Sequence, residues 1–592
     1  MWPYLQPTRQ SNEIQNVFLG LDKNLRSDTR GWYDMENISP RDFPVFAPRK
    51  PRGAVKTLTA PAGIAARDAL VYVDGTALYI NGTVVTGLTL STAVGFVPKQ
   101  LVSMGAYIII MPDRKYVNTA DLTDYGSIDS TFTFSGDVLL TPSRVDGTTL
   151  TLGAQIVSVV PPAEPANGDY WVDSSGDIHV LRQYSAMSDA WAEIPSAYTR
   201  IDMAGIGDYF QQYDGVTLSG LTFAGTDPAM AQQIGALNAN HIIYTIGADS
   251  IVVTGLLNEA HTLVDVTVVV KREMPAVDFL TESENRLWGC KYGIVDGKNV
   301  NEIYACEQGN FRNWSRYMGI ATDSYAASVG SDGKFTGAVT HLGYPIFFKE
   351  TCLIKVYGSQ PSNYRIETTN CRGVQEGSHL SLAIVNEMLY YKGRTDVLAY
   401  DGSLPVGVGD ALGSETYRKA VAGVYKERYY INMQGADTKW NLFLYDTQRR
   451  LWYREDDAQV MGFAQVDDEL YYIDTATRKL VSVYGSTGTS EGAVTWSATT
   501  GIIGYDQKDH KYLSRFNLRV KMDASATFRV YLRYDSAGEW EKVGDMRGTG
   551  ITRTFMLPVR PRRCDHLEMK LSGTGDVRIF SIARILEVGS DG

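Results

Sequence analysis

The sequence has no apolar run long enough to cross a membrane and no sign of a disulfide framework. No segment approaches the ~20 consecutive apolar residues that a spanning helix needs. The start of the chain, Met1 to Pro7, lacks the basic and apolar regions of a secretory signal peptide. The five cysteines, at 290, 306, 352, 371 and 564, have no zinc-type spacing. We therefore expect reduced, mostly buried thiols in a protein made in the cytoplasm.

The sequence also lacks the common patterns of catalysis. It has no phosphate-binding loop, no HExxH or GxSxG motif and no zinc-ligand set. Cys564 and His566 flank Asp565, but on a strand Asp565 would point to the opposite face and could not orient the histidine. The segment from Asp173 to Asp177 lacks the further acids of a calcium loop and predicts a hairpin turn. We expect no cofactor, no metal, no catalytic residues and a chain that is not an enzyme.

Charge is unevenly distributed along the chain. The 56 Lys and Arg against 67 Asp and Glu give a net charge of −11, which disfavours a protein that coats nucleic acid. From Gly501 to Gly592, however, 16 Lys and Arg stand against 12 Asp and Glu. A basic C-terminal module on an acidic body suggests contacts between parts of an assembly, although ordinary surface variation gives the same pattern.

What the sequence does contain is a repeat and many aromatic residues, 36 of them tyrosines. A polar turn leads into a short aromatic-rich run seven times, and in the second half the copies are roughly 40 residues apart, the length of a propeller blade. Each run is apolar throughout, as expected of a strand covered on both faces. The seven copies are Asp68–Gly75, Gly105–Pro112, Asn285–Cys290, Gly343–Lys349, Asn386–Lys392, Lys426–Asn432 and Asp468–Asp474.

These patterns predict an all-β protein: a β-propeller of about seven blades, an inserted small β-barrel region and a C-terminal β-sandwich. The predicted divisions are an N-terminal arm (1–53), first blades (54–129), an insertion (130–275), further blades (276–500) and the sandwich (501–592). The one clear helix signal is Asp227, which caps a short segment with Pro228 in its first turn.

The predicted insertion interrupts the blades between Ser130 and Pro275. Its strand signals are compatible with a small β-barrel or with a pair of β-modules. Trp171 and Trp191 are candidate contact residues, because exposed aromatic rings can hold sugars, although aromatics on strands more often lie in a core. Insertions in repeat arrays emerge from loops on one face and often make its contacts.

Two basic clusters are further interface candidates. Arg560, Arg562 and Arg563 lie in the sandwich, where they could bind an acidic neighbour or form a solvated turn. Arg49, Lys50 and Arg52 belong to the N-terminal arm, whose prolines predict an extended segment along a surface. Within that arm, residues 16–21 are the candidate strand that closes the propeller ring.

Three N-terminal segments, Phe18–Asn24, Asp34–Ser39 and Phe43–Arg49, resemble the opening of phage virion propeller proteins. There a Gly-Leu-Asn-like strand precedes Met-x-Asn-Leu/Ile-Ser and Pro-x-x-x-Pro-Arg motifs. Thr322–Phe335 and Cys371–Val374 are also similar to phage-encoded homologues. The best-understood proteins of this kind are the tail nozzle proteins of short-tailed phages, also called tail tubular protein B or packaged-DNA stabilisation proteins, and the similarity to them is of architecture more than of sequence motif. That family has no catalytic residues to carry over.

The resemblance implies a structural tail component, with a nozzle or tail-ring subunit as the first hypothesis. Such a subunit would form a ring of about six copies around the DNA channel, retain packaged DNA and open for ejection. Its partners would be itself, adaptor or portal-side proteins, tail fibres and DNA that passes without sequence-specific binding. It would be made in the host cytoplasm and reside in the virion tail. The alternative is a receptor- or glycan-binding tail protein that acts through the insertion.

Overall fold

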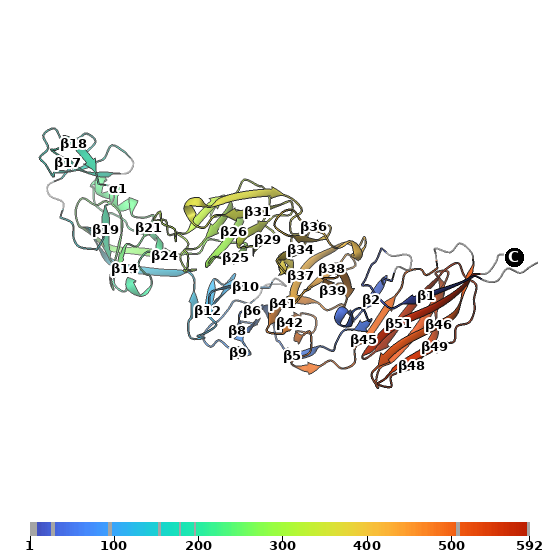
Figure 1. Ribbon diagram of the computed structural model, residues 1–592. Helices are drawn as coiled ribbons and strands as arrows, with labels where there is room; N and C mark the ends of the chain where they lie inside the picture. Colours follow the sequence, from blue (N-terminus) through green and yellow to red (C-terminus); the bar gives the residue numbers. More distant parts are fainter. Residues whose placement is uncertain are drawn as a thin grey trace, which may run out of the picture.

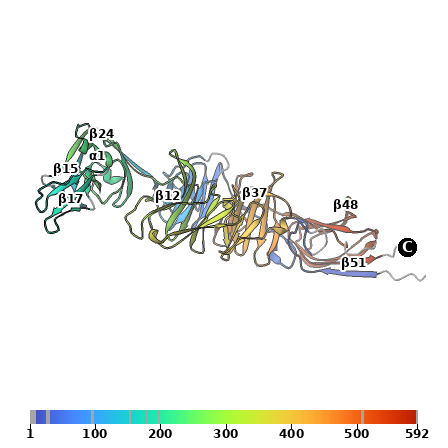
Figure 2. The same cartoon turned by 90° about the horizontal axis from the view of Figure 1, so that it is seen from above.

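The computed structural model describes residues 9–24, 30–92, 98–151, 155–176, 179–194, 197–504 and 510–588. It is an elongated, almost entirely β protein with three parts in a row (Figure 1). A propeller occupies the middle, an inserted domain lies at one end and a sandwich at the other, and the view from above keeps the same order (Figure 2). Among the described residues there is one α-helix, α1 (Pro228–Ala236). Asp227 caps it by accepting a hydrogen bond from the Ala229 amide, as predicted.

The propeller has seven blades, each an antiparallel sheet, which confirms the predicted fold class. The first two precede the insertion and the other five follow it. The strands of the first four blades are β6–β9 (Pro61–Ala66, Leu70–Asp74, Ala77–Ile80, Thr83–Val84), β10–β13 (Gln100–Met104, Tyr107–Met111, Lys115–Asn118, Tyr125–Ser127), β25–β28 (Phe279–Ser283, Arg286–Val295, Lys298–Ala305, Tyr325–Ser328) and β29–β32 (Gly337–His341, Tyr344–Phe348, Cys352–Tyr357, Arg365–Asn370).

The fifth to seventh blades complete the ring. Their strands are β33–β36 (Ala383–Val385, Met388–Lys392, Val397–Tyr400, Val406–Gly407), β37–β40 (Tyr417–Tyr425, Arg428–Gly435, Trp440–Asp446, Leu451–Arg454), and β41–β43 with β5 and β44 (Val460–Val466, Glu469–Asp474, Lys479–Ser482, Gly53–Thr57, Thr489–Ser490). The innermost strands of successive blades touch one another around the ring, with the short turn η4 (His379–Ser381) between the fourth and fifth blades.

The seven aromatic runs are the second strands of the seven blades. The central residues of β30, β34 and β38 are buried without interruption. Each blade is covered by a neighbour on both faces, so these strands are apolar on both faces. The physical reason given for the repeat is therefore confirmed.

The strand that closes the ring is β5, not residues 16–21. β5 pairs antiparallel with β43 of the seventh blade, and the chain then continues directly into the first blade. A Cβ on Gly53 would lie 1.9 Å from the Thr487 carbonyl oxygen, so this approach requires glycine. Residues 16–21 form no strand; Leu21 makes only isolated bridges, to Trp32 and Trp452.

The inserted domain is not the predicted small β-barrel but a pair of β-modules, the alternative that the sequence also allowed. The larger is a curved seven-stranded sheet whose described strands do not close into a barrel, and α1 packs against it. The smaller is a four-stranded sheet. Their strands are β14 (Ser130–Ser143), β19–β24 (Tyr198–Asp202, Gly215–Ser219, Asn240–Ile242, Thr245–Ile246, Ser250–Thr254, His261–Arg272) and β15–β18 (Ile156–Ser158, Tyr170–Asp173, Val180–Ser185, Ala190–Glu193).

The sandwich contains N-terminal strands as well as the predicted C-terminal ones. One sheet has the order β1-β51-β46-β49 and the other β2-β45-β50-β47-β48. The alternating burial of β46 and β50 confirms the predicted alternation. The strands are β1 (Arg9–Gln15), β51 (Val577–Val588), β46 (Lys511–Met522), β49 (Thr552–Leu557), β2 (Asp34–Glu36), β45 (Thr495–Thr499), β50 (Leu567–Thr574), β47 (Thr527–Tyr534) and β48 (Ala537–Arg547).

The N-terminal arm therefore joins propeller and sandwich and does not run along a surface. Between β2 and β5 it forms a small hairpin of β3 (Ile38–Ser39) and β4 (Ala47–Pro48), with the turn η1 (Pro40–Asp42) between them. Phe46, Arg49 and Arg52 are all buried there. The predicted extended run is therefore wrong: residues 40–45 form turns and a bend, and the apolar residues between the prolines pack inward.

Candidate functional site: a basic cavity where the N-terminal arm meets the propeller

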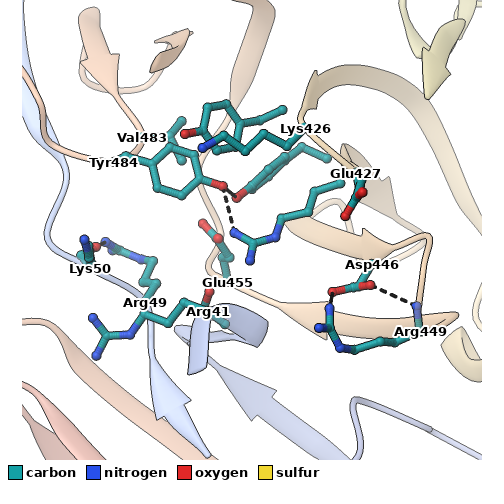
Figure 3. A pocket seen from close by; sticks show the side chains of 14 residues that line it. Arg41, Arg49, Lys50, Lys426, Glu427, Asp446, Arg449, Glu455, Val483 and Tyr484 are labelled. Carbon is teal, nitrogen blue, oxygen red and sulfur yellow. Dashed lines mark hydrogen bonds and ion pairs between the residues drawn. The ribbon is translucent and has the colours of Figure 1, made fainter. Parts of the chain in front are cut away.

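A cavity of about 260 Å³ lies where the N-terminal arm passes the sixth and seventh blades (Figure 3). We call it the basic cavity. Three separate segments line it: the η1–β4 hairpin of the arm, the start of β38 with the β39–β40 turn, and the residues after β43. Its lining residues are Ser39, Arg41, Arg49, Lys50, Tyr425, Lys426, Glu427, Arg428, Tyr430, Asp446, Arg449, Glu455, Val483 and Tyr484.

Positive charge dominates this lining. Six of the residues are Lys or Arg and three are Asp or Glu. The whole chain carries −11, so the cavity differs in sign from the average surface. A low-dielectric wall strengthens the field of such a cluster, which makes an anion the favoured ligand.

Several of these cations are already paired. Arg41 contacts Asp576 of the sandwich, and Arg49 contacts Glu491, which follows the seventh blade. The Arg449 guanidinium donates to Asp446 at 2.8 Å. Arg41 thus links the arm to the sandwich and Arg49 links it to the segment after the seventh blade, whereas Arg449 pairs within the β39–β40 turn. All three guanidiniums already have a carboxylate partner.

Arg52 lies behind the cavity wall and not in it. Its buried guanidinium contacts Glu455 and Asp456 and donates to the Tyr472 hydroxyl at 2.9 Å. Burial by itself would raise the pKa of Asp456, but the Arg52 and Arg49 guanidiniums outweigh it and hold this pKa below its ordinary value. The carboxylate therefore stays charged, and Arg52 is a structural residue of the arm.

Arg428 is different, because no carboxylate of the described residues pairs with it. The half-buried guanidinium donates to the Tyr484 hydroxyl at 3.2 Å, and that hydroxyl is 2.6 Å from the Tyr430 hydroxyl. Burial raises the pKa of Tyr484 to about 12, so it remains a neutral phenol. The charge of Arg428 is thus balanced only by polar neutral groups and by more distant carboxylates.

Of the sequence-predicted cations, the structure brings Arg49 and Lys50 into the cavity and places Arg52 beside it. Sequence reasoning missed Arg428 and Tyr484. Arg428 lies in the aromatic repeat Lys426–Asn432, and its charge at the start of a buried strand was the available signal. Nothing local to Tyr484 indicated that it would face the arm.

The tryptophans of the insertion belong to the small four-stranded sheet. Trp171 is buried and donates from Nε1 to the Ser158 carbonyl at 3.0 Å, and its ring lies 5.5 Å from that of Trp191. Trp171 is therefore core and not a sugar platform. Trp191 is half-buried and also contacts Tyr184.

The basic cluster of the sandwich is exposed. Arg562 pairs with Glu541 at 3.0 Å and lies over the Tyr534 ring, whereas Arg560 and Arg563 form no ion pair among the described residues. None of these three arginines lines the basic cavity.

Asp565 does contact His566, contrary to the sequence argument. The Asp565 carboxylate is 3.0 Å from Nδ1 of His566, and Nε2 of the same ring is 2.8 Å from the Ser536 hydroxyl. Residues 564–566 precede β50 and are not a strand, so the alternation that we assumed does not apply. Ser536 and Asp565 are exposed, and the Asp535 carboxylate also accepts from the Asp565 amide. We interpret these bonds as fixing the β47–β48 turn.

The described residues also bear on the predicted hairpin turn at Asp173, on possible metal sites and on possible membrane helices. Asp173 accepts from the Ser175 amide and pairs with Arg182 at 3.1 Å, as a hairpin residue does, and Asp177 lies outside the described residues. No group of three or more His, Cys, Asp or Glu in the described part of the chain could hold a metal ion. None of the described helices has the length and apolar character for a membrane span.

No protein-family model matches the sequence, and no curated protein is similar to it. Solved structures with a similar fold include an exo-β-1,3-galactanase from Phanerochaete chrysosporium (8% identity, 52% of this chain and 94% of that one, TM-score 0.21). Another is an arabinoxylan arabinofuranohydrolase of glycoside hydrolase family 43 from Bacillus subtilis (10% identity, 52% of this chain and 95% of that one, TM-score 0.18). A third is Trypanosoma rangeli sialidase (10% identity, 98% of this chain and 96% of that one, TM-score 0.16).

These three proteins are enzymes, and this finding corrects our expectation that the chain is not one. The lack of a familiar catalytic motif in the sequence was too weak a ground for that exclusion, and we do not retain it. At TM-scores of 0.16 to 0.21, however, the similarity does not assign any particular activity to this chain.

Proposed function

We propose that the protein is a structural subunit of a phage tail, a nozzle or tail-ring component that packs into a ring around the DNA channel. In this role it retains packaged DNA and opens for ejection. It would be made in the host cytoplasm, assemble in about six copies, and contact adaptor or portal-side proteins and tail fibres. DNA would pass without sequence-specific contacts.

The observation that carries this proposal is the opposite charge of the two ends of the molecule. Between Ser130 and Pro275 the sequence has 5 Lys and Arg against 16 Asp and Glu, a net of −11. The sandwich at the other end is basic. An elongated subunit with an acidic and a basic end favours head-to-tail contact with another copy, and such heterologous contacts close into rings when the rotation allows.

The basic end also presents a suitable surface. Arg515, Arg519 and Lys521 alternate along the outer face of β46 and form no ion pair among the described residues. Ile14 and Met556 lie on the same face, 59% and 69% exposed, in register with Asn517 through β51 and β49. Exposed apolar side chains among unpaired cations are typical of a contact surface.

The negative charge of the inserted domain exceeds the positive charge of the sandwich. In a ring, the surplus would be left near the channel, where it repels DNA phosphates and lets the duplex slide.

The N-terminal segments that resemble phage virion propeller proteins support the same proposal. Phe18, Met35 and Phe46 from these segments are buried where the arm joins the sandwich to the propeller. The similar motifs therefore stabilise the arrangement of the subunit, which a ring under internal DNA pressure requires.

The experiment is a measurement of assembly. We expect the purified chain to form a ring at low salt, seen by mass photometry and negative-stain electron microscopy, and to dissociate in high salt. Changing Arg515, Arg519 and Lys521 to Glu should abolish the ring, whereas changing exposed Lys298 of the third blade to Glu should not. A chain that is monomeric under all conditions and absent from purified particles would refute the proposal.

The alternative, receptor or glycan binding through the insertion, is favoured by one observation. A cavity of about 450 Å³ lies between the two β-modules, and His179, Gln233 and His241 line it together with apolar residues. Polar side chains over an apolar floor can hold a sugar. Glycan-array binding that disappears when Ser130–Pro275 is deleted would support this alternative.

A further inference from the structure

We propose that the basic cavity is a binding site for a phosphate-type oxyanion, with Arg428 and Lys50 as its principal ligands. This inference is independent of ring formation, because all its residues belong to one chain. Nothing in the proposed tail function requires such a site.

The first step in the argument is the unused bonding capacity of Arg428. A guanidinium has five N–H donors in a fixed planar fork. Only one of them, which donates to Tyr484, has an acceptor among the described residues. A half-buried guanidinium with free donors is costly unless water or an anion satisfies it, and an oxyanion gives charge-assisted bonds of about twice the strength of neutral ones.

The second step is the set of cations at the rim. Lys50 is exposed and has no ion pair or hydrogen bond from its ammonium among the described residues. Lys426 is paired with Asp468 at 3.0 Å, but both side chains are largely exposed, so the pair is weak and exchangeable. An anion in the cavity would therefore meet one free ammonium and a second that a surface pair holds only loosely.

The third step concerns the carboxylates that would oppose an anion. Asp446 accepts from Arg449, and Glu455 is in contact with Arg52, so the charges of both are offset. Glu427 is the exception: it is exposed at the rim, and no ion pair of the described residues neutralises it. Its negative charge should weaken anion binding, so removing that charge should strengthen binding, whereas removing a cation should weaken it.

The shape of the cavity favours a tetrahedral oxyanion. Arg41, Arg49 and Lys50 come from the arm, whereas Lys426 and Arg449 come from the blade and Tyr484 from the residues after β43 (Figure 3). Lys50 and Arg428, the cavity cations without an ion pair among the described residues, come from two of these segments, which suits a group with acceptors in several directions, and the paired arginines add only to the positive potential. Water occupies about 30 Å³ per molecule in the liquid, so the cavity has room for phosphate with bridging waters.

The test is isothermal titration of inorganic phosphate into the full chain, with sodium chloride at matched ionic strength as the blank. A second arm uses a short DNA duplex, because the phosphate can be free or part of a phosphodiester. We expect saturable binding that Arg428→Gln weakens at least about tenfold, the effect of losing a charged hydrogen-bond donor. Lys50→Gln should weaken it several-fold, and Glu427→Gln should strengthen it.

Two features keep the test decisive. Lys50 and Glu427 are exposed, so their variants fold even if Arg428→Gln does not, and Lys298→Gln on the third blade is the matched control with a cation removed elsewhere. Binding of duplex alone, lost in Arg428→Gln, supports the site with a phosphodiester as the source. No saturable binding in millimolar phosphate or of duplex, or equal binding by wild type, Arg428→Gln and Lys50→Gln, would overturn the proposal.

Discussion

The sandwich and the inserted domain lie at opposite ends of the propeller and are attached in different ways. The sandwich shares one continuous hydrophobic cluster with the fifth to seventh blades and the N-terminal arm. The inserted domain has a hydrophobic cluster of its own, separate from that of the second and third blades. We call the two attachments the sandwich joint and the insertion joint.

Aromatic packing and buried ion pairs build the sandwich joint. The Trp32 ring lies 4.8 Å from Phe46 and 6.5 Å from Phe18, and Phe46 lies 5.9 Å from Trp496 of β45. The Arg52 contacts with Glu455 and Asp456 lie close by. Since the chain crosses this joint through the arm as well as after β44, apolar and covalent connections both resist bending.

Polar contacts build the insertion joint. β14 and β24 leave the propeller as a two-stranded ribbon. Beside it, the Asn313 side chain of the third blade accepts from the Gly215 amide at 3.1 Å and donates to the Tyr213 carbonyl at 3.0 Å. Asp214 and Arg272 pair within the inserted domain. A joint without a shared core can open locally at lower free energy than one that is part of a core.

The two ends should therefore differ in rigidity although both are β-domains. The basic cavity lies at the rigid side, where a bound anion would add to an already fixed arrangement. The acidic inserted domain lies at the side where the two parts share no hydrophobic cluster.

The largest predicted effect is at the sandwich joint. Trp32→Ala should lower the free energy of unfolding by about 3–5 kcal/mol, because a fully buried tryptophan leaves a cavity in the shared core. Urea unfolding followed by tryptophan fluorescence and circular dichroism measures it. Tyr33→Ala, at a neighbouring residue that is 46% exposed, is the control and should change stability far less. Equal effects of the two variants would contradict a sandwich joint that is held by its buried aromatic core.

A smaller effect is predicted at the insertion joint. Asn313→Ala removes bonds to Tyr213 and Gly215, which should cost about 1–3 kcal/mol locally and leave the propeller folded. Hydrogen exchange should then be faster in β14 and β24 but unchanged in the sandwich. Asn299→Ala, an exposed position on β27 of the same blade, is the control. Faster exchange throughout the chain would contradict a separate joint.

The smallest effect is a pH dependence confined to the inserted domain. Burial lowers the pKa of His241, partly opposed by its bond to the Leu237 carbonyl. In the unfolded chain His241 binds a proton near pH 6.5, whereas in the folded domain it binds one only at lower pH. The contribution of His241 to the free energy of unfolding is therefore full above pH 6.5 and decreases as the pH falls below it. The loss is at most about 1.4 kcal/mol per pH unit.

Scanning calorimetry between pH 7.5 and 5 checks this prediction. His241→Gln should flatten the pH dependence of the transition that belongs to the inserted domain. Burial also lowers the pKa of His379 in the propeller, to about 4, so His379→Gln should flatten the propeller transition and leave the other unchanged. If His379→Gln flattened both transitions, the two regions would unfold as one unit.

Much of the fold could be predicted because its signals are local. A strand such as β38 is covered on both faces and must be apolar throughout, so seven buried runs such as Lys426–Asn432 mark seven blades. The sandwich strands alternate because one face meets solvent. The ring-closing strand could not be predicted, since Gly53–Thr57 is short, small and weakly apolar, and only its pairing with a strand more than 400 residues away defines it.

The candidate site was predictable only in part. The basic run Arg49–Arg52 marked the arm as a contact region, but its cations differ: Arg49 and Arg52 are buried and ion-paired, whereas Lys50 is exposed and has no ion pair among the described residues. Arg428 and Tyr484 become part of one site only through contacts between segments distant in sequence. The contact of Asp565 with His566 could not be predicted for a related reason, because the chain turns at these residues and does not form a strand.

The sequence by itself determined that this is a β-propeller with added β-modules, since periodicity and burial act through neighbouring residues. Tertiary structure alone decided which strand closes the ring, that the N-terminal arm belongs to the sandwich core, and where positive charge gathers around a cavity. Those features depend on pairing across hundreds of residues, where the free energy of many weak contacts, not any local pattern, selects the partner.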